Sequence, residues 1–207
     1  MMGMFRRIRN DHAVSPVVGV MLMLVITVII AAVVSAFAGG MAESQDKVPQ
    51  VTIQSTFSIS KGMVIRHAGG DPLAMHDIAF TIWDGPTFGP NVEQSTKQAL
   101  NMMNMTGASG VPVMAGDGSF EVTVFRAGDA LSISAMNCTC DVLQPNIAPS
   151  DFAEHGDNAT YDITNGKEKR RWGLCLRNPD SIGKEFVLTV SDRSGRMIAQ
   201  THVTVEA

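Results

Sequence analysis

The chain has 207 residues with a formal net charge of −4 at pH 7, and 45% of its residues are hydrophobic. Nucleic-acid-binding domains concentrate Lys and Arg on one face, so this acidic balance argues against DNA or RNA as a partner. The length leaves room for one domain with its own hydrophobic core beyond a membrane helix.

The first predicted element is a helix over residues 14–38, a stretch without charge in which only Ser15, Thr27 and Ser35 have polar side chains. As a helix it would be about 37 Å long, enough to cross a hydrocarbon layer of about 30 Å. A helix that is apolar on every face is typical of a membrane span or of burial among copies of itself.

Basic residues flank this stretch on its N-terminal side only, at Arg6, Arg7 and Arg9. The positive-inside rule therefore places the N-terminus in the cytoplasm and exports everything from Gly39 onward. The residues alone leave two fates open: a secretory signal cut after Ala36-Phe37-Ala38, or an anchor that is never cut.

A third fate comes from a resemblance. Residues 12–37 read His-Ala-Val-Ser-Pro-Val-Val-Gly-Val and continue into an apolar helix that contains Thr-Val-Ile. This pattern resembles the archaeal type IV pilin N-terminal domain family. The resemblance implies that residues 1–13 are a class III leader, that a prepilin peptidase cuts between Ala13 and Val14, and that the helix 14–40 stays on the mature protein. His12 stands where such leaders usually have Lys or Arg, and Val18 stands where bacterial pilins have glutamate.

Small side chains recur every fourth residue along the predicted helix, with Met23 as the one interruption. Such a row lets neighbouring helices approach closely within a membrane. Small residues are also common in membrane helices for other reasons, so helix packing is one of two interpretations. The residues of the row are Gly19, Thr27, Ala31, Ser35 and Gly39.

Beyond residue 40 the pattern alternates between apolar and polar residues, which is typical of half-buried strands. We expect residues 41–207 to form an all-β antiparallel sandwich or barrel-like domain, with its final hairpin turning at residues 192–195. Three segments, residues 67–73, 125–131 and 186–195, also resemble the pilin family. The predicted strands cover residues 51–60, 62–67, 76–83, 120–124, 131–135, 186–190 and 203–205.

Two segments lack this alternation and are predicted as surface loops, residues 85–118 and 144–171. A short helix is possible over residues 95–105. These loops could carry specificity for a partner, or could be solvated connections.

Modification sites are the main chemistry that the sequence suggests. Asn104, Asn137 and Asn158 begin N-x-S/T sequons and are candidate N-glycosylation sites on an exported domain. A disulfide is expected between Cys175 and either Cys140 or Cys138, which leaves one cysteine unpaired. No cofactor and no metal are expected, because three cysteines at this spacing and five scattered histidines do not form a ligand set. The sequence has no nucleophile motif and no phosphate-binding loop, so we expect no enzymatic activity.

The resemblance implies a structural subunit of an archaeal type IV pilus-like surface filament. Its helix would assemble the filament core and its β domain would be exposed for adhesion. The implied partners are copies of itself or related pilins, the prepilin peptidase, the pilus assembly machinery, and the membrane before assembly. The precursor would lie in the plasma membrane and the mature protein in an extracellular filament. The alternative is a membrane-anchored exported β-domain binding protein that does not polymerise.

Overall fold

A computed structural model describes residues 16–41, 47–150 and 166–207, with side chains of the first range described up to residue 37. The chain divides into two compact units, Met1–Lys47 and Val48–Ala207. Each unit is described by itself below.

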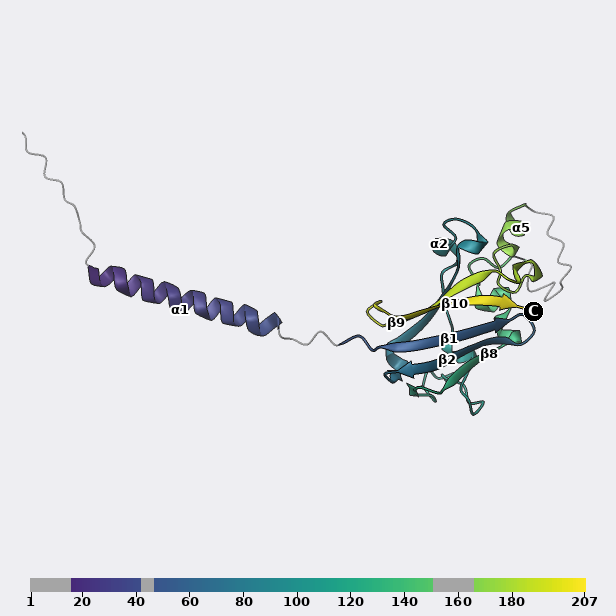
Figure 1. The fold of residues 1–207 in the computed structure, drawn as a ribbon, viewed down its shortest axis with the longest axis horizontal. Helices are drawn as coiled ribbons and strands as arrows, with labels where there is room; N and C mark the ends of the chain where they lie inside the picture. The colour runs from purple at the N-terminus through teal and green to yellow at the C-terminus, as the bar shows by residue number, and fades with distance from the viewer. Residues whose placement is uncertain (1–15, 42–46, 151–165) are drawn as a thin grey trace, which may run out of the picture. The chain divides into compact units, whose positions relative to one another are not determined.

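The first unit contains the helix α1, which spans Pro16–Met41 (Figure 1). Pro16 begins the helix, where its missing N–H group costs nothing because the first turn has no intrahelical acceptor for it. The predicted apolar helix followed by a β domain is confirmed. The helix continues through Gly39 and Gly40 to Met41.

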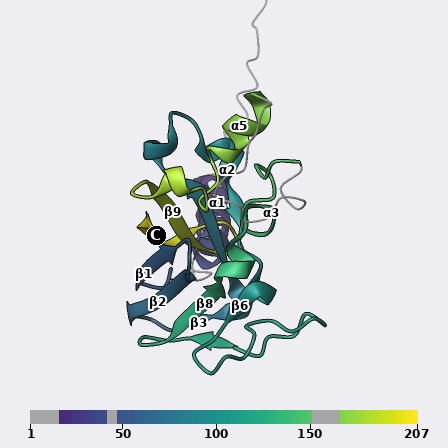
Figure 2. The same cartoon turned by 90° about the vertical axis from the view of Figure 1, so that its right-hand side faces the viewer.

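The second unit is built on an eight-stranded sheet with the order β5-β4-β9-β10-β1-β2-β8-β6, which curls into a half-barrel. Figure 1 shows β10, β1, β2 and β8 side by side, and Figure 2 shows β8, β3 and β6 gathered at one end of the domain. A two-stranded sheet of β3 and β7 completes the domain. The strands are β1 Val51–Ser58, β2 Gly62–Gly70, β3 Leu73–Ala74, β4 Ile78–Asp84, β5 Gln98–Ala99, β6 Met105–Thr106, β7 Val124–Phe125, β8 Ala130–Ser134, β9 Glu185–Asp192 and β10 Met197–Glu206.

All pairings between these strands are antiparallel except one, between β1 and β10. Phe57 of β1 lies beside Val205 of β10 in this parallel pair. The first and last strands of the domain are therefore neighbours in the middle of the sheet. The β9–β10 hairpin turns at residues 192–195 as predicted, and the Ser194 hydroxyl donates to Asp192 Oδ1 at 2.6 Å. This bond and those from Arg196 lower the pKa of Asp192 to about 2.

The core consists of the side chains that alternate inward from these strands. Four phenylalanines, Phe57, Phe80, Phe125 and Phe186, are fully buried. Phe57 and Phe186 meet edge to face with ring centroids 5.6 Å apart, and Phe80 and Phe125 do so at 6.3 Å. Edge-to-face pairs of this kind add specific geometry to the burial of apolar area. The first pair joins β1 to β9 within the large sheet, and the second joins β4 of the large sheet to β7 of the small sheet.

The segment 85–118 differs from the predicted surface loop. Its middle supplies both edge strands of the large sheet, with β5 beside β4 and β6 beside β8. Leu100, Met102 and Met105 are buried in the core, because the Met-rich run fills space between the two ends of the curled sheet. The helix suggested over residues 95–105 is wrong for most of that range, since α2 covers only Glu93–Thr96.

The predicted loop 144–171 is described only in part. It follows the short helix α3, Cys140–Leu143, and ends in the helix α5, Gly166–Trp172. Gln144 and Ile147 are buried, which corrects the surface-loop prediction at its start. Short 3-10 helices at Met75–Asp77, Pro86–Phe88, Met102–Asn104, Ala135–Cys138 and Pro179–Ser181 complete the described elements.

Candidate functional site

The helix α1 is the first candidate site, because its apolar surface is exposed along its described length. All fifteen large apolar side chains between Val17 and Phe37 are at least 46% accessible. By length and composition, Pro16–Phe37 could span a membrane. A helix with such a surface is insoluble alone, so lipid or other helices must cover it.

The predicted row of small residues lies on this exposed helix. Gly19 has no neighbouring atom within 4 Å of where a Cβ would be. The Thr27 hydroxyl donates to Leu24 O at 2.8 Å, so it needs no partner from lipid. Ala31 and Ser35 are exposed. Gly39 falls within α1, beyond the residues whose side chains are described.

The geometry of a helix decides how this row could be used. A row at every fourth residue runs at an angle of about 26° to the helix axis. A neighbour that packs along the whole row must therefore cross α1 at an angle. A straight parallel neighbour would meet only part of it.

The predicted cleavage bond between Ala13 and Val14 lies outside the described residues, and so does Asn158. Asn104 ends a 3-10 helix next to β6, and Asn137 lies in the 3-10 helix Ala135–Cys138. Both asparagines are half-buried. Glycosylation at these three sequons stays a prediction.

The structure joins Cys140 and Cys175 in a disulfide, with their Cα atoms 5.8 Å apart. Cys138 remains a free thiol, fully buried, and it donates to Ile133 O at 3.7 Å. Burial raises the pKa of the Cys138 thiol to about 11, so it stays protonated and unreactive at neutral pH.

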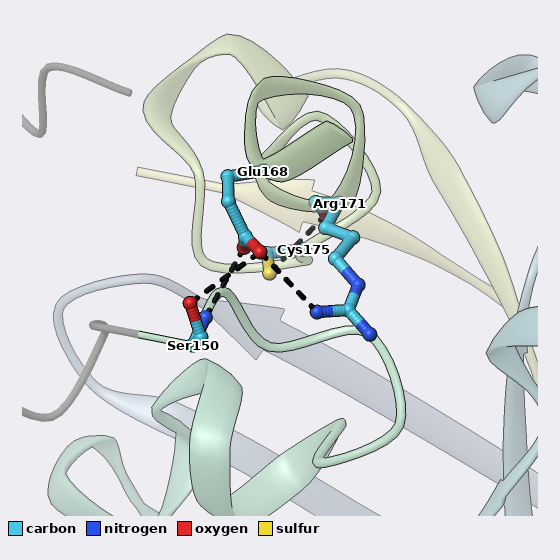
Figure 3. A network of polar contacts seen from close by, with 4 residues as sticks. All are labelled: Ser150, Glu168, Arg171 and Cys175. Carbon is cyan, nitrogen blue, oxygen red and sulfur yellow. Dashed lines mark hydrogen bonds and ion pairs between the residues drawn. The ribbon is translucent and has the colours of Figure 1, made fainter. Parts of the chain in front are cut away.

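Polar contacts hold α5 beside this disulfide, as Figure 3 shows. Glu168 Oε2 accepts from Ser150 N at 3.1 Å, and Glu168 Oε1 lies 3.5 Å from Arg171 Nη1. The Cys175 sulfur lies 3.7 Å from Arg171 O. A disulfide sulfur has no proton to donate, so this last approach is a packing contact. The bridge and Glu168 together fix the chain on both sides of the segment 151–165.

A buried polar cluster, Asp84 with Gln144, lies at the end of β4. Gln144 Nε2 donates to Asp84 Oδ1 at 2.9 Å, and Gln144 Oε1 accepts from Leu176 N at 2.8 Å. Asp84 is 0% exposed, and its Oδ2 has no hydrogen-bond partner among the described residues. Burial raises the pKa of Asp84 to about 7, against the smaller opposing effects of the Gln144 bond and of Lys184. The cluster links β4 to the disulfide-bonded segments.

Sequence reasoning did not find this cluster, because a single Asp at the end of a strand looks like an ordinary turn residue. Asp129 is such a turn residue, since its Oδ2 accepts from Arg126 N at 2.8 Å. Asp71 instead joins two distant parts of the chain, because its Oδ2 accepts from Gln50 N at 3.0 Å. One signal was available for Asp84, since it continues the inward alternation of Ile78, Phe80 and Ile82. Within the described ranges, no three His, Cys, Asp or Glu side chains are grouped to hold a metal.

An exposed apolar helix ahead of a separate β domain fits the class of proteins that are held in a membrane or assembled through their N-terminus. Comparison with known proteins narrows this class. Residues 12–53 match the family model for the N-terminal region of archaeal type IV pilins. The resemblance of the N-terminal segment to that family is therefore confirmed. The match supports a pilin-like role.

The remaining comparisons cover less of the chain. An uncharacterized protein of Archaeoglobus fulgidus is 41% identical over 73 residues, which are 34% of this chain and 51% of that protein. The chain thus spans about half the length of the curated relative it matches. No solved structure matches the chain.

Proposed function

We infer that the chain is a structural subunit of an archaeal type IV pilus-like surface filament. The observation that carries this proposal is that the pilin family match, residues 12–53, coincides with a helix whose apolar side chains are exposed. Residues 1–13 are its leader, 14–40 its assembly helix, and 41–207 its exported domain. The prepilin peptidase cuts between Ala13 and Val14.

The cost of exposing α1 to water favours two successive environments for the helix, first the lipid bilayer and then a bundle of other helices. Fifteen large apolar side chains of α1 are exposed, and burying each is worth about 1.5–3 kcal/mol relative to water. The total, roughly 20–45 kcal/mol, means that α1 never faces water for long. Transfer from lipid to a helix bundle involves no such gain, so close packing through small residues must supply the preference for assembly.

The decisive experiment determines the N-terminus of the protein in two fractions from cells that make it, sheared surface filaments and membranes. Mass spectrometry should find chains beginning at Val14 in the filaments and a mixture of cut and uncut chains in the membranes. A chain beginning at Gly39 would mean secretion, and uncut chains in membranes with none in filaments would leave an anchored protein.

The second candidate is the anchored binding module that does not polymerise, which the separate β domain favours. Immunolabelling with an antibody against the domain separates the two proposals. Labelled filaments support the subunit. Label confined to the cell envelope, in cells whose filaments are visible and unlabelled, supports the anchored module.

A further inference from the structure

Trp83 is a large aromatic side chain on the outer face of the sheet. Ile78, Phe80 and Ile82 of β4 are buried in the core, and strand alternation places Trp83 on the opposite face. The indole is half-buried. A half-exposed indole presents apolar area and an N–H donor to any ligand at this face.

The chain next to Trp83 is held rigidly. Asp84 N donates to Thr96 Oγ1 at 2.9 Å, and Thr96 Oγ1 donates to Val92 O at 2.9 Å. Thr96 is 1% exposed, so these bonds fasten α2 to the residue that follows Trp83. Lys97 then leads into β5, whose Gln98 pairs with Ile82.

This arrangement leaves a hollow of about 290 Å³ lined by Trp83, Glu93, Gln94 and Lys97. Within the described part of the chain, none of these four side chains makes a hydrogen bond or an ion pair. The volume lies just below the usual range for ligand sites, roughly 300–1,000 Å³. It fits one ring better than an extended chain.

We propose that the hollow beside Trp83 is a binding site for a single pyranose ring of a glycan. The indole offers a flat apolar surface for the C–H face of the ring. Glu93 accepts hydrogen bonds from hydroxyls, Lys97 donates to them, and Gln94 does both. A ligand that donates and accepts hydrogen bonds on one side and is apolar on the other complements all four residues.

The charges of the hollow argue against other ligands for an exposed aromatic side chain. Glu93 repels an anion such as a nucleotide phosphate, and the net charge of −4 disfavours binding to a nucleic acid backbone. Lys97 repels a quaternary ammonium ion, which needs an aromatic cage without a competing cation. The site would work on a filament or on an anchored chain, so its failure is separable from failure of the proposed function.

The test uses the full chain in a detergent whose headgroup is not a sugar, because a sugar headgroup would compete. The two tryptophans give two indole N–H signals in a ¹⁵N-correlated NMR spectrum, and the signal lost in Trp83→Phe belongs to Trp83. Methyl glycosides of glucose, galactose, mannose and N-acetylglucosamine are then titrated. We expect at least one to shift the Trp83 signal while the Trp172 signal stays in place.

Two matched variants complete the test. Gln94→Ala should weaken binding about fivefold, the effect of one hydrogen bond, and Gln200→Ala, an exposed glutamine on β10, should leave it unchanged. The proposal is overturned if no glycoside shifts the Trp83 signal, or if Gln94→Ala and Gln200→Ala bind equally. It is also overturned if only an unlabelled second copy of the chain shifts the signal, because the hollow would then be a subunit contact.

Discussion

Asp84 is the residue whose ionisation the fold opposes, since its carboxyl group is buried with one oxygen unpaired. Its pKa is raised from 3.8 to about 7. Between these two values the folded chain keeps a proton that the unfolded chain has lost, so this group makes the domain less stable as pH rises from about 4 to about 7. Above pH 7 both states are ionised and the loss is constant.

Replacing Asp84 with Asn, which cannot ionise and keeps an oxygen for Gln144 Nε2, should remove this loss. A shift of about three units corresponds to at most roughly 4 kcal/mol. By thermal denaturation, Asp84→Asn should melt up to about 10 °C above the parent at pH 8 and near it at pH 4. Asp141→Asn, at an exposed position, is the control. A constant difference between parent and Asp84→Asn at every pH would refute the assignment.

The Cys140–Cys175 bridge closes a loop over a sequence separation of 35 residues. The chain-entropy model gives about 4 kcal/mol for a loop of this size. The double variant Cys140→Ser/Cys175→Ser should therefore melt about 10 °C lower in calorimetry. Reductant should lower the melting temperature of the parent equally and leave that of the double variant unchanged. Cys138→Ala, which keeps the bridge, should remain sensitive to reductant.

The sequence left the partner of Cys175 open between Cys138 and Cys140, and only the fold separates them. Cys138 ends a 3-10 helix and faces the main core, whereas Cys140 begins α3 and faces Cys175. Although Cys138 and Cys140 are only two residues apart, their side chains lie in different hydrophobic clusters. Such a choice depends on tertiary contacts that local patterns do not encode.

At the scale of the element, α1 offers a matched pair of positions. Ala31 lies on the row of small residues, and Ala32 lies about 100° around the helix from it. Leucine at either position makes the helix equally apolar, so insertion into the membrane should be unchanged. Ala31→Leu should reduce filaments at least tenfold by electron microscopy, while Ala32→Leu should leave them near the parental number. Equal effects at both positions would mean that the row is not the contact surface.

The elements also show where sequence patterns succeed. Residues 51–60, 76–83 and 186–190 alternate between apolar and polar side chains over most of their length, and each overlaps a strand. The alternation has exceptions, since Ser55 takes an inward position of β1 and Val187 is buried on the other face of β9. The segment 98–106 has no alternation, because β5 and β6 are each two residues long. Their pairing depends on the curl of the whole sheet, which local sequence does not show. The Pro, Gly and Asn residues nearby therefore favoured the prediction of a loop. The parallel pairing of β1 with β10 could not be predicted from the sequence either, because it also depends on how the whole sheet curls.

At the scale of the whole molecule, the core of the β domain is built from residues between Val51 and Val205. We therefore expect residues 48–207, produced without α1, to fold cooperatively. Their melting temperature should lie within a few degrees of that of the full chain in detergent, measured by circular dichroism. A broad transition, or a midpoint more than about 10 °C lower, would show that the helix contributes to the stability of the domain.

The two edge strands β5 and β6 are too short to favour association between identical β domains that are packed closely together. In an assembled fibre every domain would sit among identical domains at very high local concentration, where a long open strand recruits a neighbour and begins cross-β growth. Here both ends of the sheet stop after two residues, and residues 100–104 connect them across the core. Such ends give a neighbouring chain little template, so identical domains can be crowded together without fusing through their backbones.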